Sequence, residues 1–440
     1  MKNRLFKTAL RAGIILLLVG IVLEIGVRIV IDLPADTDFY SSIGKSGIEK
    51  HQKRWKVKTV TGATWIHLGW IANPDKEVYT VFQKGDKWTQ IGETTFGSFL
   101  IRHLKPDTAY SFRVKANSDT FDYTVTARTA GCLSNNIYIP EISSRWRPLF
   151  HPQKTGSYIN DHTIFRSPDG KWHVAGITAF GEGDYSREVY FAHGVSNEFP
   201  PAGMMRELEP IADYGHLAWA PHVVEHKNRL YMWFSPHRGY LATSTDGTHW
   251  REEREHTFLP YHPQFRDPMI LKVSENQWLM YVTARSGYYS TVDVYQSFDL
   301  VHWQYIRPAL ETACGCERAG AQASTESPFV LQHKGRYYLS VTYNNDSFFW
   351  NPLLLTMKIW LDRENYNETL IFQSDNPYDF GIYRGHRQPS SLLTVLSAHA
   401  PEYFEHNGQW YITTAGWPWI STLTRGEVAC ALLKWKLKEE

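Results

Sequence analysis

The stretch Ala220-Pro-His-Val-Val-Glu-His-Lys-Asn-Arg-Leu-Tyr231 runs from an apolar strand through a Lys-Asn turn into a second, aromatic strand. This is the pattern of a β-hairpin, because turn residues separate two segments rich in strand-forming side chains. Four further segments align with it over the same length: 161–172, 267–278, 327–338 and 400–411. One hairpin is therefore repeated five times along the chain.

The spacing of the repeats predicts the fold. The second residues of the five segments lie 47 to 73 residues apart, which suits four-stranded propeller blades with loop insertions. The pattern Ser-x-Asp-x-x-x-Trp follows two hairpins, at 244–250 and 297–303. We expect this short Asp turn to close the outer strands of a blade and to place its Trp between blades. The chain is thus predicted to be all-β, with a five-bladed β-propeller at residues 132–440.

Short alternating segments between Trp55 and Thr129 predict a small antiparallel β-sandwich ahead of the propeller. The run Leu104-Lys-Pro-Asp-Thr-Ala-Tyr110 fits a corner at which the Tyr hydroxyl returns to the backbone. Together with Trp70, the expected core residue, this run resembles a fibronectin type III domain, which we place at residues 54–130. The resemblance implies a module that positions its neighbours.

The N-terminus has the layout of an export signal. Four basic residues precede an uninterrupted apolar run at residues 12–23, and extending the run to residue 33 spans a bilayer if Glu24 and Arg28 are tolerated. We expect an anchor helix, or transmembrane segment, at residues 1–35. It would hold the chain in a membrane with its bulk in the periplasm or at the cell surface. A cleaved signal peptide, and hence a secreted protein, is the alternative.

The composition limits the classes of ligand and partner that we expect for the chain. Lys plus Arg number 46 and Asp plus Glu 45, a net charge of +1, so bulk charge gives no reason to expect a nucleic-acid partner. The four cysteines lack zinc-site spacing. A disulfide between Cys132 and Cys430 would tie the two ends of the large C-terminal region together, and unpaired thiols are the alternative. The same two alternatives hold for Cys314 and Cys316.

The repeats also predict a site. The first strand of each blade lines the central channel of a propeller, so residues at the five repeat starts converge. The acidic residues there are Asp161, Asp267 and Glu326, with Glu402 one position beyond the proline of the fifth repeat. Glycoside hydrolysis needs such a set, because one carboxyl protonates the leaving oxygen while another activates water or attacks carbon. A single Asp before a strand is more often a turn residue, so the hypothesis depends on the set.

Further residues near the repeat starts are candidates for substrate binding, each with a structural alternative. The aromatic side chains are either a sugar-stacking wall or core, Arg266 is either a substrate clamp or a structural ion pair, and His399 is a hydrogen-bond donor, an ion ligand or a structural residue. The candidates are Trp219, His222, Arg266, His399, Glu402 and Trp417.

The blade starts resemble those of the family-43 glycoside hydrolases, five-bladed propellers that act on arabinosides and xylosides. The matching motifs are Tyr158-Ile-Asn-Asp161, Trp219-Ala-Pro-His-Val223, Phe265-Arg-Asp-Pro268 and Thr325-Glu-Ser-Pro328. The resemblance covers about 300 residues. It implies Asp161 as general base, Asp267 as the residue that tunes the acid and orients substrate, and Glu326 as general acid, with inversion at the anomeric carbon. It implies a carbohydrate substrate and no required cofactor or metal, and leaves a central calcium open.

Two alternatives stay open. The related fructosidase families share an Asn-Asp-Pro start and an Arg-Asp-Pro motif, and there the first Asp is a nucleophile and the reaction retains configuration. Here His162 follows Asp161 in place of Pro, and Ser327 follows Glu326 in place of Cys. The other alternative is a surface carbohydrate-binding propeller that has kept the fold without turnover.

Overall fold

A computed structural model of the chain describes residues 57–72, 77–118, 121–131, 136–153, 157–179, 185–211, 214–262, 264–286, 289–312, 325–342, 367–383, 392–418 and 423–438. The predicted anchor at 1–35 lies outside these residues, as do Cys132, Cys314 and Cys316. Within the described ranges no helix has the length and apolar character needed to cross a membrane.

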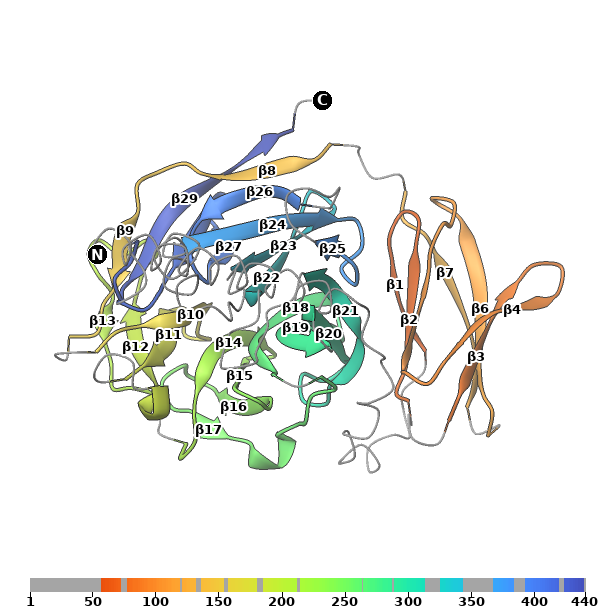
Figure 1. The fold of residues 1–440 in the computed structure, drawn as a ribbon, viewed down its shortest axis with the longest axis horizontal. Helices are drawn as coiled ribbons and strands as arrows, with labels where there is room; N and C mark the ends of the chain where they lie inside the picture. Colours follow the sequence, from red (N-terminus) through yellow and green to blue (C-terminus); the bar gives the residue numbers. More distant parts are fainter. Residues whose placement is uncertain are drawn as a thin grey trace, which may run out of the picture.

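The described chain is all-β apart from two short 3-10 turns, and most of it forms a ring of five sheets (Figure 1). The innermost strands contact one another in sequence, and the last contacts the first, so the ring closes. They are β10 (Asn160–Arg166), β14 (Trp219–His226), β18 (Arg266–Ser274), β22 (Glu326–His333) and β27 (Glu402–His406). These are the first strands of the five predicted hairpins.

Each sheet then continues outward by antiparallel pairing. The second strands are β11 (Trp172–Thr178), β15 (Arg229–Ser235), β19 (Gln277–Ser286), β23 (Arg336–Thr342) and β28 (Gln409–Thr414). The third strands are β12 (Tyr190–Ser196), β16 (Tyr240–Ser244), β20 (Tyr289–Ser297), β24 (Glu368–Ser374) and β29 (Val428–Leu437). The fourth strands are β13 (Arg206–Glu207), β17 (Arg251–Glu252), β21 (Gln304–Thr312), β26 (Leu392–Ser397) and β8 (Tyr138–Ile142).

The two ends of the ring are joined by strand pairing. β8 precedes the first blade in sequence, yet it pairs with β29 of the fifth blade, and β9 (Arg147–Phe150) pairs with the same strand. Cys430 on β29 is a free, buried thiol, and burial raises its pKa to about 12. The backbone ladder, and not a disulfide at Cys430, therefore holds the ends together.

The innermost strands share a local irregularity at their starts. The register shifts at the beginning of β10, β14, β18 and β22, as in a β-bulge. One residue at each start, and the matching residue before β27, has a positive φ: Asp161, Ala220, Asp267, Ser327 and Ala400. A proline follows in four of the five repeats, and it fits a bulge because no ladder hydrogen bond is required there. The same backbone kink is thus presented five times around the axis.

The two Asp turns close blades as expected. Asp246 Oδ1 accepts hydrogen bonds from the backbone N–H groups of Thr248 and His249, each at 2.8 Å. The indole of Trp250 packs edge-on against Phe165 of the preceding blade. The second turn repeats this arrangement, with Trp303 edge-on to Trp233 of the preceding blade. The placement of each Trp between blades is confirmed.

The N-terminal sandwich consists of two sheets over one core. The first is β1 (Lys58–Thr61), β2 (Ile66–Gly69) and β5 (Ser98–Ile101), and the second is β4 (Trp88–Thr94), β3 (Tyr79–Lys84), β6 (Ala109–Ala116) and β7 (Asp122–Arg128). Trp70 is fully buried between them. The hydroxyl of Tyr110 accepts a hydrogen bond from the Lys105 N–H at 2.9 Å, which is the predicted corner.

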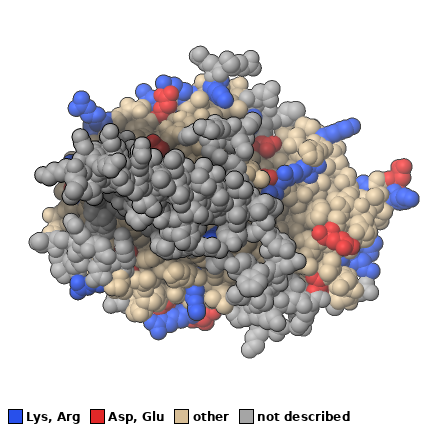
Figure 2. Space-filling view, in the orientation of Figure 1, with Lys and Arg blue, Asp and Glu red and all other residues tan. Residues whose placement is uncertain are grey.

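The sandwich packs directly against the third and fourth blades (Figure 1). Trp65 shares a core cluster with blade residues, and its indole donates to the Asp375 carbonyl at 2.9 Å. Gln296 donates to the Gly97 carbonyl at 2.7 Å, and His67 stacks on Tyr378. Both apolar area and buried hydrogen bonds therefore fix the sandwich to the ring. Figure 2 shows acidic and basic side chains interspersed on the described surface, in line with the balanced charge.

Candidate active site

The five positive-φ residues at the starts of the repeats meet at the axis of the ring and line an open hollow of about 310 Å³. The lining comes from all five innermost strands and their leading residues. It consists of Asp161, His162, Ala220, Pro221, His222, Asp267, Pro268, Met269, Ser327, Pro328, Phe329, Ala400, Pro401 and Glu402. The predicted convergence of the repeat starts is therefore observed in space.

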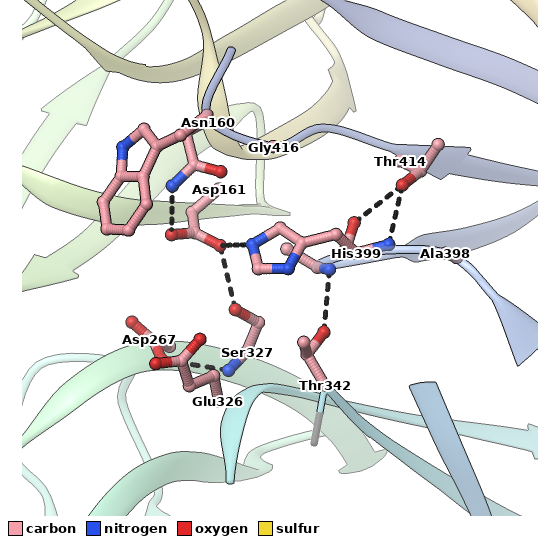
Figure 3. A network of polar contacts seen from close by, with 12 residues as sticks. Asn160, Asp161, Asp267, Glu326, Ser327, Thr342, Ala398, His399, Thr414 and Gly416 are labelled. Carbon is pink, nitrogen blue, oxygen red and sulfur yellow. Dashed lines mark hydrogen bonds and ion pairs between the residues drawn. The ribbon is translucent and has the colours of Figure 1, made fainter. Parts of the chain in front are cut away.

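Asp161 lies on the innermost strand of the first blade and accepts two hydrogen bonds in this hollow. Its Oδ2 accepts a hydrogen bond from Asn160 and its Oδ1 accepts one from the Ser327 hydroxyl, each at 2.9 Å (Figure 3). Burial raises its pKa well above the ordinary value, and the charges of Asp267 and Glu326 raise it further, while the Ser327 hydrogen bond acts in the opposite direction. Asp161 thus has a strong tendency to hold a proton when the hollow is empty.

Asp267 and Glu326 stand across from Asp161 on the third and fourth innermost strands, β18 and β22. Oδ2 of Asp267 accepts the backbone N–H of Ser327 at 2.9 Å. Arg266 reaches both acids, with Nη2 3.3 Å from Glu326 Oε1 and Nε 3.6 Å from Asp267 Oδ2. A guanidinium at this distance favours the ionised form of a carboxyl. Arg266 therefore makes the ion pair that was one of its two predicted roles.

His399 comes from the fifth blade and faces Asp161. Its Nε2 lies 3.7 Å from Asp161 Oδ1, and the side chain is 1% exposed (Figure 3). The Thr414 hydroxyl donates to the His399 carbonyl at 2.9 Å and accepts from its N–H at 2.8 Å. These two hydrogen bonds join β28 to the segment before β27 and fix the position of the imidazole at the edge of the hollow. From there the imidazole faces the Asp161 carboxylate.

A second polar pair lies further along the hollow. Glu402 Oε2 accepts the Ile164 N–H at 2.6 Å, and its Oε1 lies 3.2 Å from His222 Nδ1. Because Glu402 ties the first and fifth blades together, it has a bonding role that does not require substrate. Among the described residues, no group of three or more His, Cys, Asp and Glu side chains is arranged to hold a metal ion.

Trp219 and Trp417 lie beside the hollow, and both are close to Glu188, which was not among the predicted site residues. The indole N–H of Trp417 donates to Glu188 Oε1 at 3.3 Å, and Trp219 lowers the pKa of the same carboxyl. Glu188 lies in the first blade between η4 (Tyr185–Arg187) and β12. No repeat places an acid there, so the sequence carried no signal for it.

Ser327 was also missed, and here a signal existed. It occupies the same repeat position, with the same positive φ, as Asp161 and Asp267. Glu326 instead aligns with Asn160 and Arg266, one residue earlier. A search limited to acidic residues finds Glu326 and overlooks the serine that bonds to both aspartates.

Comparison with known proteins gives one sequence match. A sequence model of the glycosyl hydrolases family 32 N-terminal domain matches residues 201–351. The matched segment contains the second to fourth innermost strands, with Asp267 and Glu326, and Asp161 precedes it. No curated protein matches the chain.

Solved structures with a similar chain path include enzymes of two families. A family-43 enzyme of Xanthomonas citri complexed with xylose is 14% identical, with 67% of this chain and 92% of that chain covered and a TM-score of 0.45. The family-32 β-fructofuranosidase of Bombyx mori is 16% identical, with coverages of 67% and 63% and a TM-score of 0.46. Sucrose-6-phosphate hydrolase from Lactobacillus gasseri is 15% identical, with coverages of 67% and 62% and a TM-score of 0.45.

The family 32 match has a consequence for the sequence-based expectations. It bears out the prediction of a glycoside hydrolase. The matched family is family 32, whereas the motifs quoted from the sequence had favoured family 43.

Proposed function

We propose that this chain hydrolyses a glycosidic bond of an oligo- or polysaccharide in the axial hollow. One observation carries the proposal: three carboxyls from three blades lie close enough that Asp267 and Glu326 both raise the pKa of Asp161. A structural cluster of acids gains nothing from such repulsion, whereas a glycosidase needs one carboxyl protonated and another ionised near neutral pH.

The proposed reaction is acid–base hydrolysis of an arabinoside or xyloside with inversion. Glu326 gives its proton to the departing glycosidic oxygen as that oxygen's bond to the anomeric carbon breaks. Asp161 takes a proton from a water whose oxygen forms the new bond to the same carbon from the opposite face. Asp267 would hold a sugar hydroxyl and keep negative charge beside the acid.

Burial and the charges of Asp267, Glu326 and Glu188 favour a proton on Asp161, whereas its proposed role as general base requires the ionised carboxylate. Substrates whose leaving groups differ in acidity therefore test which of Asp161 and Glu326 is the general acid. An aryl glycoside with an acidic phenol does not need a general acid, so Glu326→Gln should retain activity on it while Asp161→Asn does not. The reverse result would exchange the two roles.

A second candidate is a retaining, fructoside-type hydrolase in which Asp161 attacks the anomeric carbon. The observation that favours it is the family 32 match over residues 201–351. A retaining enzyme forms a covalent glycosyl intermediate that an alcohol can intercept. Methyl glycoside formed in the presence of methanol would support this candidate, and its absence together with an inverted first product would support the first.

The decisive experiment is hydrolysis of a panel of arabinosides, xylosides and fructosides by the wild type, Asp161→Asn and Glu326→Gln. We expect reducing sugar from at least one natural substrate with the wild type and its loss in both variants. Glycan binding by all three proteins without release of sugar by the wild type would instead establish a carbohydrate-binding propeller.

We also propose that the chain is exported and held at the outer side of a membrane by residues 1–35, with a fibronectin type III-like module following. The basic and apolar N-terminal pattern supports export, and the three- and four-stranded sheets with the Tyr110 corner support the module. Fractionation of cells expressing the full chain tests the first point. Recovery of the chain only in the cytoplasm would refute it.

A further inference from the structure

Glu188 is a buried carboxylate beside the catalytic candidates. It is fully buried, and its Oε1 accepts hydrogen bonds from the Tyr158 hydroxyl at 2.5 Å and from the Trp417 indole at 3.3 Å. Its Oε2 is buried with no hydrogen-bond partner among the described residues. An ionised carboxylate left with one unbonded buried oxygen costs stability, so its retention points to a use.

The side chains that meet Glu188 come from three blades and lead to the hollow. Tyr158 lies three residues before Asp161, and Trp219 immediately precedes Ala220, a bulge residue of the hollow. Trp417 follows the Thr414 strand end that clasps His399. Glu188 therefore lies among side chains of the first, second and fifth blades, and the segments that carry these side chains lead into the hollow.

Electrostatics couple the two acids. Burial raises the pKa of Glu188 to about 7, and the hydrogen bonds from Tyr158 and Trp417 limit the rise. The charge of Glu188 in turn raises the pKa of Asp161. Among the described residues, the groups that shift the two pKa values include no cation, and the side chain of the neighbouring Arg187 is exposed. A proton on Glu188 therefore favours ionisation of Asp161, and a charge on Glu188 opposes it.

We propose that Glu188 is a positioning residue of the hydrolase: its buried carboxyl group holds Tyr158 and Trp417 in place next to the hollow that contains Asp161, and its negative charge acts on the acids of that hollow. The inference rests on the proposed function and adds a regulator of that site. It predicts that the acid side of the activity profile reports two linked carboxyls and not Asp161 alone.

Glu188→Gln separates the charge from the hydrogen bonds. The amide oxygen can still accept from Tyr158 and Trp417, whereas the negative charge is gone. We expect the acidic limb of kcat/KM to move to lower pH, so that activity below the wild-type limb rises about three- to tenfold, with KM changed less than about twofold. Glu188→Ala removes the anchor as well, and we expect KM to rise about tenfold or more.

A purely structural carboxylate would behave differently. Glu253 is a matched control, because it is also buried and bonded, to Thr243 and Arg251 on the outer part of the second blade. Glu253→Gln should lower stability and leave the pH limb in place. An unmoved limb in Glu188→Gln, in an enzyme that hydrolyses its substrate, would overturn the inference.

A readout without turnover separates this inference from the proposed function. Infrared titration of the carboxyl band in the substrate-free protein should show the Asp161 midpoint falling in Glu188→Gln and the Glu188 midpoint falling in Asp161→Asn, because the coupling is reciprocal. Coupled titrations without any hydrolysis would refute the hydrolase and keep the coupling. Independent titrations would refute the coupling whether or not the chain is an enzyme.

Discussion

Replacing Ser327 by alanine tests whether the acids of the hollow work as a bonded set. The Ser327 hydroxyl donates to Asp161 Oδ1 and its N–H donates to Asp267 Oδ2, both at 2.9 Å. The substitution removes the first bond and leaves the second. A hydrogen bond to a charged group contributes about 1.5–3 kcal/mol. At about 1.4 kcal/mol for each factor of ten, kcat/KM should fall about 10- to 150-fold at pH values on the acid side of the limb.

The loss should depend on pH in a defined direction. The hydroxyl lowers the pKa of Asp161 against burial and the charges of Asp267 and Glu326. Without the hydroxyl, Asp161 keeps its proton to higher pH, so the acidic limb of kcat/KM moves upward. The deficit should therefore be largest on the acid side and smallest well above the limb, where Asp161 is ionised in both proteins.

The assay is the initial rate of glycoside hydrolysis across the acid and neutral range. Ser340→Ala is the control, because it removes a buried hydroxyl of the same blade that donates to the Phe329 carbonyl at 3.4 Å and not to an acid. It should leave the limb unmoved. A Ser327→Ala enzyme with kcat/KM within about twofold of wild type at every pH, or with a limb moved to lower pH, would show that the hydroxyl does not hold Asp161 in its working state.

Four further outcomes are expected. Arg266→Gln removes the cation 3.3 Å from Glu326, so Glu326 should keep its proton to higher pH and the basic limb of kcat/KM should move upward; a downward shift would contradict the ion pair. Asp161→Asn should raise the melting temperature, increasingly from acid to neutral pH, because a buried carboxyl with a raised pKa costs stability once the unfolded chain ionises. Asp169→Asn should do the reverse, since hydrogen bonds from Lys171 and Ser167 lower the pKa of Asp169 to about 2 and the stability they give is lost only as the pH falls towards that value. Trp65→Ala should lower the free energy of unfolding in urea by about 3–5 kcal/mol and expose the sandwich to limited proteolysis; a loss under about 1 kcal/mol would mean that the sandwich is not fixed by this side chain.

Much of the fold followed from local pattern. The repeated hairpins became the inner two strands of each sheet because turn residues and alternating apolar side chains specify a hairpin without reference to the rest of the chain. Strand β6, Ala109–Ala116, lies in the stretch whose alternation predicted the sandwich. Strand β1 spans only four residues, too few for an alternating pattern to identify it as a strand. The pairing of β8 and β9 with β29 could not be predicted from the sequence either, because only the closed ring brings these strands together.

The site could be predicted to the extent that it follows the repeats. Asp161 and Asp267 occupy one repeated position, and the ring brings them to one hollow. Glu188 has no counterpart in the other blades, and its hydrogen bonds to Tyr158 and Trp417 depend on loops that the repeat does not specify. A periodic pattern predicts the positions that the symmetry repeats, and side chains that break the symmetry must be found in the structure.

That break in symmetry explains how one backbone kink, repeated five times, yields a site with direction. The kink carries an acid in the first and third blades, a hydroxyl in the fourth, and only a methyl group at Ala220 and Ala400. Side chains at left-handed bulges point to the axis of the ring, so large residues at all five positions would fill the hollow of about 310 Å³. Because the innermost strands follow one another around the axis, Ala220 lies between Asp161 and Asp267, and Ala400 lies between Ser327 and Asp161. The two alanines therefore leave room on both sides of Asp161. A sugar bound there could have Asp161 on one face and Glu326 on the other, as an inverting displacement at one carbon requires.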